Sequence, residues 1–250
     1  FGLVRKALIE RETMLRSAPH IMPPLRFVMP HDAGGRPAWM IRAGLFLYDH
    51  LATRQALPAS ATVDLRRHPA GASLAPRYRK GFVYSDGWVD DARLVVANAM
   101  DAHERGARVL TRCACVRLER AGAEWIATLR HDGGGEQAVR ARLVVNAAGP
   151  WVAEFLDHCS PVPARHHPRQ IQGSHIVVRR LFDHDCAYIF QAPDGRIVFA
   201  LPYERDFTLL GTTEHEFTGD LAQPGIGRDE VQYLLAMANA GPGTNGSQFF

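Results

Sequence analysis

Two polar residues open an apolar stretch late in the chain. Ser174 and His175 precede Ile176, Val177 and Val178, in a pattern typical of a strand. An imidazole titrates near neutral pH, so His175 could hydrogen-bond a substrate or act as a general base. A single histidine in a strand is more often structural, so this pattern by itself leaves both interpretations open.

Small residues follow a short apolar run in the middle of the chain. Asn146, Ala147, Ala148, Gly149 and Pro150 come directly after a stretch that reads as a buried strand. Without large side chains, the backbone at this point can approach a planar ligand closely. The alternative is a tight turn between a strand and a helix, which needs the same residue types.

Two hydroxyl groups end another strand pattern, at Thr212 and Thr213. Threonine at such a position is usually only a good strand former. Arg36, Arg42 and Lys80 could meet a phosphate, but isolated cations are mostly solvated surface, and we do not predict them as site residues.

The cysteines do not follow a metal-binding pattern. The chain has 4 of them, without a CxxC pair and without the density of a secreted disulfide scaffold. Cys113 and Cys115 point to one face of a predicted strand with no second ligand pair nearby, which predicts buried thiols and no metal site. The net charge of +3 is too small and scattered for a nucleic-acid-binding surface.

Hydrophobic periodicity predicts three helices. The first covers residues 1–18, and the third covers residues 90–105 and is stopped by Gly106. The second, over residues 39–51, is apolar on most faces, so we expect it to be buried. Two segments lack periodicity and are expected to be irregular: a Pro-rich connector at 18–30 and a loop at 52–82.

Strand patterns dominate the rest of the chain. Alternation at 109–118 and 125–130 predicts a hairpin around Ala121 and Gly122, and 143–146 predicts a short buried strand. Beyond Pro150, four runs separated by turn residues predict an antiparallel sheet. We therefore expect an α+β chain that interleaves a cofactor domain with a substrate-covering sheet. The four runs are 174–178, 187–191, 196–202 and 207–211.

Three longer stretches resemble a known family. They are RPAWMIRAGLFLYDHL at residues 36–51, YSDGWVDDARLVVANA at residues 84–99 and NAAGPW at residues 146–151. Together they resemble the FAD-dependent glycerol-3-phosphate dehydrogenases. GSHIVV from Gly173, RIVFALPY from Arg196 and LGTTE from Leu210 continue the resemblance in the family's order, so that it covers about residues 1–236.

The resemblance implies roles for individual residues. His175 corresponds to a histidine that faces the substrate, as an anchor or as a general base. Thr212 and Thr213 are implied to line the substrate, whereas Glu214 stands where the family commonly has aspartate, so no role is carried over to it. The residues implied to lie beside the flavin are Ala147, Ala148, Gly149, Pro150 and Trp151.

The resemblance also implies a fold and a reaction. The fold is part of an FAD-binding α/β domain of the D-amino-acid oxidase (DAO) and glutathione reductase type, interleaved with an antiparallel β-sheet substrate domain. The reaction is oxidation of sn-glycerol 3-phosphate to dihydroxyacetone phosphate, with hydride transfer to FAD and electrons passed to a quinone. The location implied is cytoplasmic, with peripheral contact at the inner membrane as an open alternative.

The domain boundaries expected from this resemblance divide the chain into four parts. Residues 1–82 form a helical and loop segment of the substrate-capping region, and residues 83–155 form part of the FAD-binding domain. Residues 156–236 form the antiparallel substrate domain. Residues 237–250 depart from the dehydrogenases and resemble a signature of cyclophilin peptidyl-prolyl isomerases, which predicts a foreign, irregular tail.

One expected motif does not occur in the sequence. The Gly-x-Gly-x-x-Gly fingerprint that cradles a dinucleotide pyrophosphate is absent, so we expect an internal fragment that does not turn over by itself. Three alternatives remain: a fragment of another flavin oxidase of the DAO superfamily, a non-catalytic remnant, and a peptidyl-prolyl isomerase fusion. The 36–51 and 84–99 stretches favour the dehydrogenase over the other oxidases.

Overall fold

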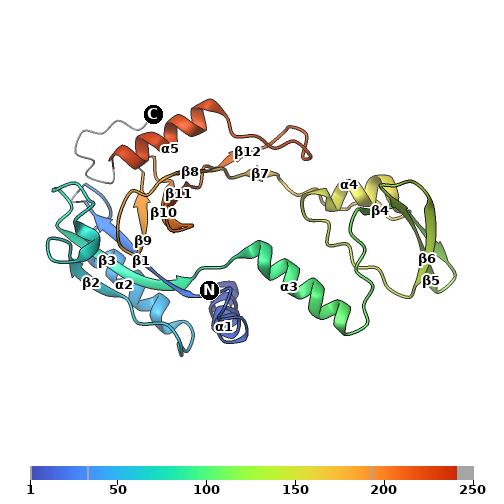
Figure 1. Ribbon diagram of the computed structural model, residues 1–250, viewed down its shortest axis with the longest axis horizontal. Helices are drawn as coiled ribbons and strands as arrows, with labels where there is room; N and C mark the ends of the chain where they lie inside the picture. Colours follow the sequence, from blue (N-terminus) through green and yellow to red (C-terminus); the bar gives the residue numbers. More distant parts are fainter. Residues whose placement is uncertain (1, 33, 193, 241–250) are drawn as a thin grey trace. The chain divides into compact units, whose positions relative to one another are not determined.

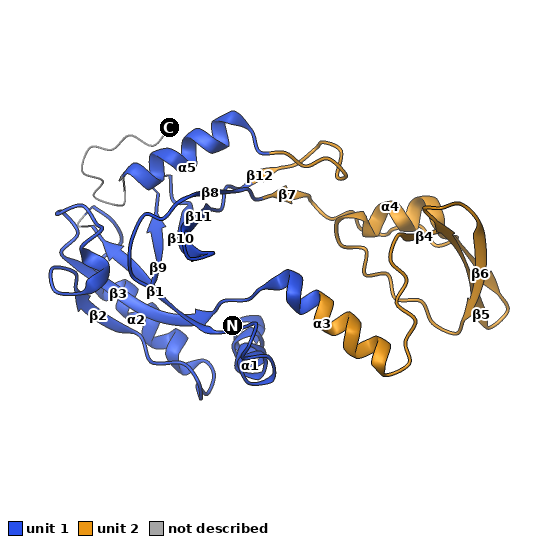
Figure 2. Ribbon diagram, in the orientation of Figure 1, with its two compact units in different colours: residues 1–95, 173–214, 226–250 blue, residues 96–172, 215–225 orange. Residues whose placement is uncertain are grey.

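The computed structural model describes residues 2–32, 34–192 and 194–240. The chain forms two compact units, shown in blue and orange in Figure 2. Unit 1 contains residues 1–95, 173–214 and 226–250, and unit 2 contains residues 96–172 and 215–225. The boundaries expected from the sequence concern roles towards flavin and substrate, and they stay a prediction.

Unit 1 is built on a seven-stranded mixed sheet in the order β2-β3-β1-β9-β10-β11-β8 (Figure 1). Strands β1 and β9 pair in parallel, and every other pair in this sheet is antiparallel. The single parallel pair joins strands from the first third of the chain to the four runs predicted as an antiparallel sheet. The strands are β1 (Pro24–His31), β2 (Ala61–Asp64), β3 (Lys80–Gly87), β8 (His175–Arg179), β9 (Ala187–Gln191), β10 (Ile197–Tyr203) and β11 (Phe207–Gly211).

The first three strands correct the sequence-based prediction. The connector expected at 18–30 contains most of β1, and the loop expected at 52–82 contains β2, the short 3-10 helix η1 (Pro69–Gly71) and the start of β3. The prolines of this segment led to the prediction of a connector, because proline cannot donate a ladder hydrogen bond and is usually found at the starts of strands and in edge strands. Strand β1 is nevertheless paired with β3 along its whole length.

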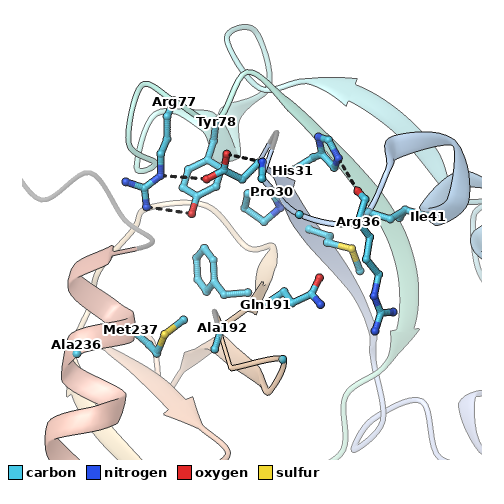
Figure 3. Close-up of a pocket in the computed structure, with 16 residues that line it drawn as sticks. Pro30, His31, Arg36, Ile41, Arg77, Tyr78, Gln191, Ala192, Ala236 and Met237 are labelled. Atoms are coloured by element: carbon cyan, nitrogen blue, oxygen red, sulfur yellow. Dashed lines mark hydrogen bonds and ion pairs between the residues drawn. The ribbon is translucent and has the colours of Figure 1, made fainter.

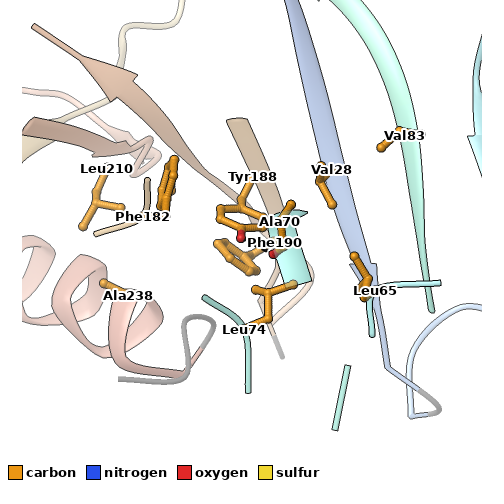
Figure 4. Packing of buried hydrophobic residues seen from close by; sticks show 11 residues of the cluster. Val28, Leu65, Ala70, Leu74, Val83, Phe182, Tyr188, Phe190, Leu210 and Ala238 are labelled. Atoms are coloured by element: carbon orange, nitrogen blue, oxygen red, sulfur yellow. Dashed lines mark hydrogen bonds between the residues drawn. The ribbon is translucent and has the colours of Figure 1, made fainter. Parts of the chain in front are cut away.

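The core of unit 1 covers one face of this sheet. Val83, Val28, Tyr188, Ala200 and Leu210 are in register across five neighbouring strands, and all are at most 3% exposed. Figure 4 shows this cluster together with side chains from the 65–74 segment and from helix α5 (Arg228–Ala240). Side chains alternate along a strand, so the residues one position on belong to the opposite face.

A chain of hydrogen bonds crosses this core. The Cys186 amide donates to His184 Nδ1 at 3.2 Å, so the ring carries its proton on Nε2 and donates to the Tyr188 hydroxyl at 2.8 Å. Tyr188 in turn donates to the carbonyl of Ala70. Burial lowers the pKa of His184, in keeping with a neutral ring.

Removing the Tyr188 hydroxyl should destabilise the chain. In Tyr188→Phe the buried Ala70 carbonyl loses its donor, and we expect the free energy of unfolding to fall by about 1–2 kcal/mol. Urea unfolding followed by circular dichroism measures this. Tyr78→Phe is the control, because its hydroxyl accepts from an exposed Arg77 side chain and should change stability by less than about 0.5 kcal/mol. Equal midpoints for the two variants would contradict the prediction.

Among the described residues, helices α1, α2 and α5 lie wholly within unit 1. Helix α1 (Gly2–Ser17) confirms the first predicted helix, and α5 packs against β8, β10 and β11. Helix α2 (Ala38–His50) also forms as predicted, but its expected burial is wrong: Trp39 is 70% exposed and Phe46 is 56% exposed. Polar contacts anchor α2 instead.

The main polar anchor of α2 is Asp49, which is 7% exposed. Its carboxylate accepts hydrogen bonds from the backbone amide and hydroxyl of Ser60, at 3.0 and 2.6 Å, and pairs with Arg54. Arg42 donates to the same Ser60 hydroxyl at 2.6 Å. A buried carboxylate is tolerated because it is fully paired, and an apolar-face prediction cannot detect this kind of anchor.

Unit 2 contains a three-stranded antiparallel sheet and the short helix α4 (Val152–Cys159). Helix α3 (Asp91–Glu104) leads into it. Two residues after its end, Gly106 has a φ of 93°, the left-handed conformation expected of a helix stop. A separate two-stranded ladder pairs β7 (Ile171–Gln172) with β12 (His215–Glu216). The strands of the larger sheet are β4 (Cys113–Ala121), β5 (Glu124–His131) and β6 (Glu136–Ala141).

Two expectations for unit 2 need correction. The strand predicted at 109–118 begins only at Cys113, and β6 was not predicted. The buried strand predicted at 143–146 is irregular, and Leu143 and Val145 are 76% and 78% exposed. An apolar run becomes a buried strand only when a neighbouring strand pairs with it, and none of the described residues pairs with this one.

The thiols and the C-terminal segment differ in part from what the sequence predicts. All four cysteines are free and partly buried, so Cys113 and Cys115 are less buried than the sequence predicts. The irregular tail predicted to start at residue 237 is wrong for residues 237–240, which continue helix α5 because Ala238 packs into the core. The rest of the cyclophilin-like segment, 241–250, lies outside the described residues. Within the described part of the chain, no helix is both long and apolar enough to cross a membrane.

Candidate active site

His175 begins β8 and lies directly opposite Gly211 of β11. Leu210 and its β8 partner Ile176 face the core, so Gly211 and His175, each one position along its strand, occupy the opposite face of the sheet. A Cβ atom added to Gly211 would lie 2.6 Å from His175 Cγ, closer than real Cβ contacts allow. Glycine at 211 therefore makes room for the imidazole to lie across the neighbouring strand.

His175 is an exposed residue at the start of β8, although neighbouring atoms shield part of its ring from water. Burial lowers its pKa from the ordinary value of 6.5, because a charged ring loses hydration there. The neutral ring is therefore the main form at pH 7. A neutral imidazole can accept a proton, which is what a general base needs.

This pKa shift is directly measurable. We expect the NMR titration midpoint of the His175 ring to lie below 6.5 in the folded chain. Because the unfolded state then binds the proton more readily, the stability contribution is present above pH 6.5 and is lost as pH falls below it. A midpoint at or above 6.5 in the folded chain would contradict this.

Thr212 and Thr213 follow β11, next to the segment that leads into β8. Thr213 is 2% exposed; its hydroxyl accepts from the Ser174 amide at 2.9 Å and donates to Glu230 of α5. The Thr212 hydroxyl donates to the Thr213 carbonyl at 2.8 Å. Both lining roles remain predictions. Thr212 is the stronger candidate, because the side chain of Thr213 is buried and already bonded on both sides.

Thr212 borders a cavity of about 510 Å³ within unit 1. Arg196 also lines it, with its guanidinium 2.6 Å from the Asp194 carboxylate and 3.8 Å from the ring centre of Tyr233 on α5. Phe199, the β10 partner of Gly211, is another wall residue, and so is Glu214. Thr212 and the stacked, ion-paired Arg196 therefore line the cavity, whereas His175 is not among its lining residues and is linked to it through Gly211, the residue before Thr212.

Sequence reasoning missed Arg196, Gly211 and Glu230. Arg196 opens the RIVFALPY stretch that carries the resemblance, so a signal was present, but nothing local marks it as part of a cavity wall. Gly211 is paired with His175, 36 positions earlier, and Glu230 accepts a hydrogen bond from Thr213, 17 positions earlier. Both contacts exist only in the folded chain. No local pattern indicates such partners.

A second cavity, of about 750 Å³, lies where β1 and β9 end (Figure 3). His31 Nε2 hydrogen-bonds the Arg36 carbonyl at 3.0 Å, and Arg77 pairs with Asp32 at 3.7 Å. Apolar side chains such as Phe190 also line it. No residue predicted for the site is among the described residues lining this cavity, so we place the candidate chemistry at the smaller one.

The residues predicted to lie beside the flavin belong to unit 2. Asn146 shapes them, because its side chain accepts from the Ala148 amide at 3.2 Å and donates to the Val152 carbonyl at 3.0 Å. Gly149 has a φ of 55°, which favours glycine, and begins the 3-10 helix η2 (Gly149–Trp151) that leads into α4.

This turn fits a planar ligand. A Cβ atom on Gly149 would meet nothing within 4 Å, and Ala147, Ala148 and Pro150 are exposed together with it. Trp151 is 43% exposed. The small, open backbone surface is what close approach to a flavin ring requires, and the flavin contacts of these five residues stay a prediction.

The cavity of unit 1 and the open glycine turn of unit 2 are described separately and do not by themselves identify a class of protein, whereas comparison with known families does. A family model described as FAD dependent oxidoreductase (DAO) matches residues 1–240. The chain belongs to this family, and FAD is the cofactor of the family.

Relatives in sequence are more specific. The chain is 51% identical to a glycerol-3-phosphate dehydrogenase of Pseudomonas aeruginosa over 240 residues, covering 96% of this chain and 46% of the relative. It is 46% identical to the aerobic glycerol-3-phosphate dehydrogenase of Escherichia coli and 45% identical to D-erythritol 1-phosphate dehydrogenase of Brucella abortus, with 96% of this chain covered in both. These matches confirm the resemblance to the glycerol-3-phosphate dehydrogenases. The chain spans about half the length of these relatives, 46–48%.

Solved structures confirm the predicted fold class. Glycerol-3-phosphate dehydrogenase from Bacillus halodurans, complexed with FAD, matches with a TM-score of 0.73 and 23% identity, covering 94% of this chain and 43% of that one. L-alpha-glycerophosphate oxidase from Mycoplasma pneumoniae, with FAD bound, matches with a TM-score of 0.71 and 14% identity, covering 96% and 63%. At these identities the likeness establishes the fold alone.

Proposed function

We propose that this chain forms part of an FAD-dependent dehydrogenase that oxidises sn-glycerol 3-phosphate to dihydroxyacetone phosphate. The observation that carries the proposal is the His175 imidazole held across Gly211, which directly precedes the cavity-lining Thr212. The relatives named glycerol-3-phosphate dehydrogenase, at up to 51% identity, support this substrate.

In the proposed mechanism His175 accepts the proton of the substrate's secondary hydroxyl. Its lowered pKa keeps the ring neutral and ready to accept that proton near pH 7. Thr212 lines the bound substrate, and the exposed turn at Ala147–Trp151 would hold the flavin. When bound, FAD supplies the two-electron acceptor for the hydride that leaves the carbon.

Recognition of the phosphate needs further cations. Arg196 is already ion-paired with Asp194 and stacked on Tyr233, so its charge is largely compensated. We therefore do not assign recognition of the phosphate to Arg196. The electron acceptor proposed is a quinone, reached from the cytoplasmic side by peripheral contact with the inner membrane.

A hybrid protein tests the proposal. Residues 2–240 would replace the matching segment of the Pseudomonas aeruginosa relative, to which the chain is 51% identical. The desalted hybrid should show a flavin absorption spectrum and be bleached without oxygen by glycerol 3-phosphate. Bleaching by D-erythritol 1-phosphate alone would shift the assignment to that substrate, as the Brucella relative suggests. A yellow hybrid that neither phosphate bleaches would overturn both.

A further inference from the structure

One carboxylate of helix α5 reaches the candidate site. Glu230 lies in the first turn of α5, where Oε2 accepts a hydrogen bond from the Gly227 amide at 2.8 Å. This bond is the glutamate half of a capping box, which satisfies an amide at the start of the helix. The other oxygen, Oε1, accepts from the Thr213 hydroxyl. A single side chain therefore ties the helix end to the segment after β11.

Thr213 connects Glu230 to the backbone next to His175 through hydrogen bonds. Its hydroxyl accepts from the Ser174 amide at 2.9 Å, and its own amide donates to the Ser174 carbonyl at 3.1 Å. Thr213 and Ser174 are 2% and 9% exposed, so water competes little for these bonds. Because Ser174 directly precedes His175, its orientation sets the course of the chain into the imidazole-bearing residue.

The hydroxyl of Thr213 can make both bonds only in one orientation. It has a single proton, and donating that proton to Glu230 turns its lone pairs towards the Ser174 amide. A bond to a charged carboxylate is stronger than one between neutral groups, so Glu230 fixes this orientation more firmly than a neutral acceptor would.

We propose that Glu230 and Thr213 are positioning residues for His175 and Thr212. The proposal rests on the proposed function for the chemistry that His175 performs. Glu230 acts through Thr213: the two residues clamp the chain where β8 and β11 leave their ladder, beside the His175–Gly211 pair. Gly173 belongs to the same arrangement, because a Cβ there would collide with the Thr212 hydroxyl.

Four substitutions distinguish the hydrogen bond between Thr213 and Glu230, called the clamp below, from the capping bond between Glu230 and Gly227. Thr213→Val removes the hydroxyl and keeps the shape, whereas Thr213→Ser keeps the hydroxyl, and both leave the bond between Glu230 and Gly227 in place. Glu230→Gln has only one acceptor oxygen for two donors. Asp229→Asn is the matched control, because Asp229 is exposed in the same helical turn.

The readout is NMR of the histidine rings in the full 250-residue chain, titrated with pH. His175→Gln assigns the His175 signal. We expect Thr213→Val and Glu230→Gln to shift this signal and to move its titration midpoint towards 6.5, while Thr213→Ser and Asp229→Asn leave it unchanged. An unchanged His175 signal in folded Thr213→Val would overturn the proposal. If Glu230→Gln unfolds because its helix cap is lost, the comparison of Thr213→Val with Thr213→Ser tests the proposal by itself.

A kinetic readout in the hybrid protein complements the NMR. Thr213→Val should lower kcat on the order of tenfold with little change in KM, as is typical when a supporting hydrogen bond of a reacting group is removed. Equal kcat for the valine and serine variants would count against positioning. A hybrid that retains His175 and its normal NMR signal but ignores glycerol 3-phosphate would refute the proposed function and leave the clamp standing.

Discussion

Replacing His175 by alanine is expected to slow the bleaching of flavin by glycerol 3-phosphate about 10²- to 10⁴-fold in the hybrid protein, the usual contribution of a general base. The reason is that His175 holds a neutral imidazole across Gly211, where it can accept the hydroxyl proton. Anaerobic stopped-flow absorbance measures the rate of flavin reduction. Flavin content after desalting should stay unchanged, because the residues predicted to hold flavin are in the 147–151 turn.

The matched control for this loss is His103→Ala. His103 is an exposed residue in the last turn of α3, and alanine is a better helix former. Its flavin should be reduced at the rate of the unsubstituted hybrid. If the flavin of the His175→Ala hybrid is reduced as fast as that of the control, His175 is not the general base. A raised KM for glycerol 3-phosphate in that variant would then indicate that His175 anchors the substrate.

Replacing Gly71 by alanine should destabilise the chain by more than about 4 kcal/mol, roughly a thousandfold in the folding equilibrium. Gly71 ends η1 against the backbone of Leu65, and an added Cβ would lie 2.6 Å from the Leu65 carbonyl carbon and closer still to its oxygen. Backbone cannot swing aside as a flexible side chain can. Leu65 is 2% exposed in the core, so a shift there also disturbs the core around Tyr188.

Urea unfolding measures this loss, with Gly44→Ala as the control. Gly44 lies inside helix α2, where a Cβ would meet nothing within 4 Å, so alanine should stabilise by about 0.5–1 kcal/mol. The same change therefore has opposite signs at the two positions. A Gly71→Ala chain that unfolds at the same urea concentration as the unsubstituted one would show that the 65–71 backbone can yield.

Part of the candidate site could be read from the sequence, because the stretches that resemble the family are contiguous. His175 and Thr212 come from two such stretches, and the structure places them near each other at the ends of β8 and β11. Glu230 could not be found in this way. Its role depends on one hydroxyl 17 residues away that helix packing brings within reach.

The sequence by itself determined the elements whose signals are local. Helices α1 and α3, the stop at Gly106, and the exact bounds of β9 and β11 follow from periodicity and turn residues within a few positions. The family also follows from the sequence, because long stretches of side chains resemble it in order.

Tertiary structure alone decided which segments pair and which faces are covered. It made β1 the parallel partner of β9 and anchored α2 through Asp49 while Trp39 stayed in solvent. It also left the apolar run at 143–146 without a partner strand among the described residues, with Leu143 and Val145 exposed. The physical reason is that strand pairing and burial depend on partners distant in the chain. An apolar pattern indicates that a residue can be buried, but only the packed fold determines which residues bury it.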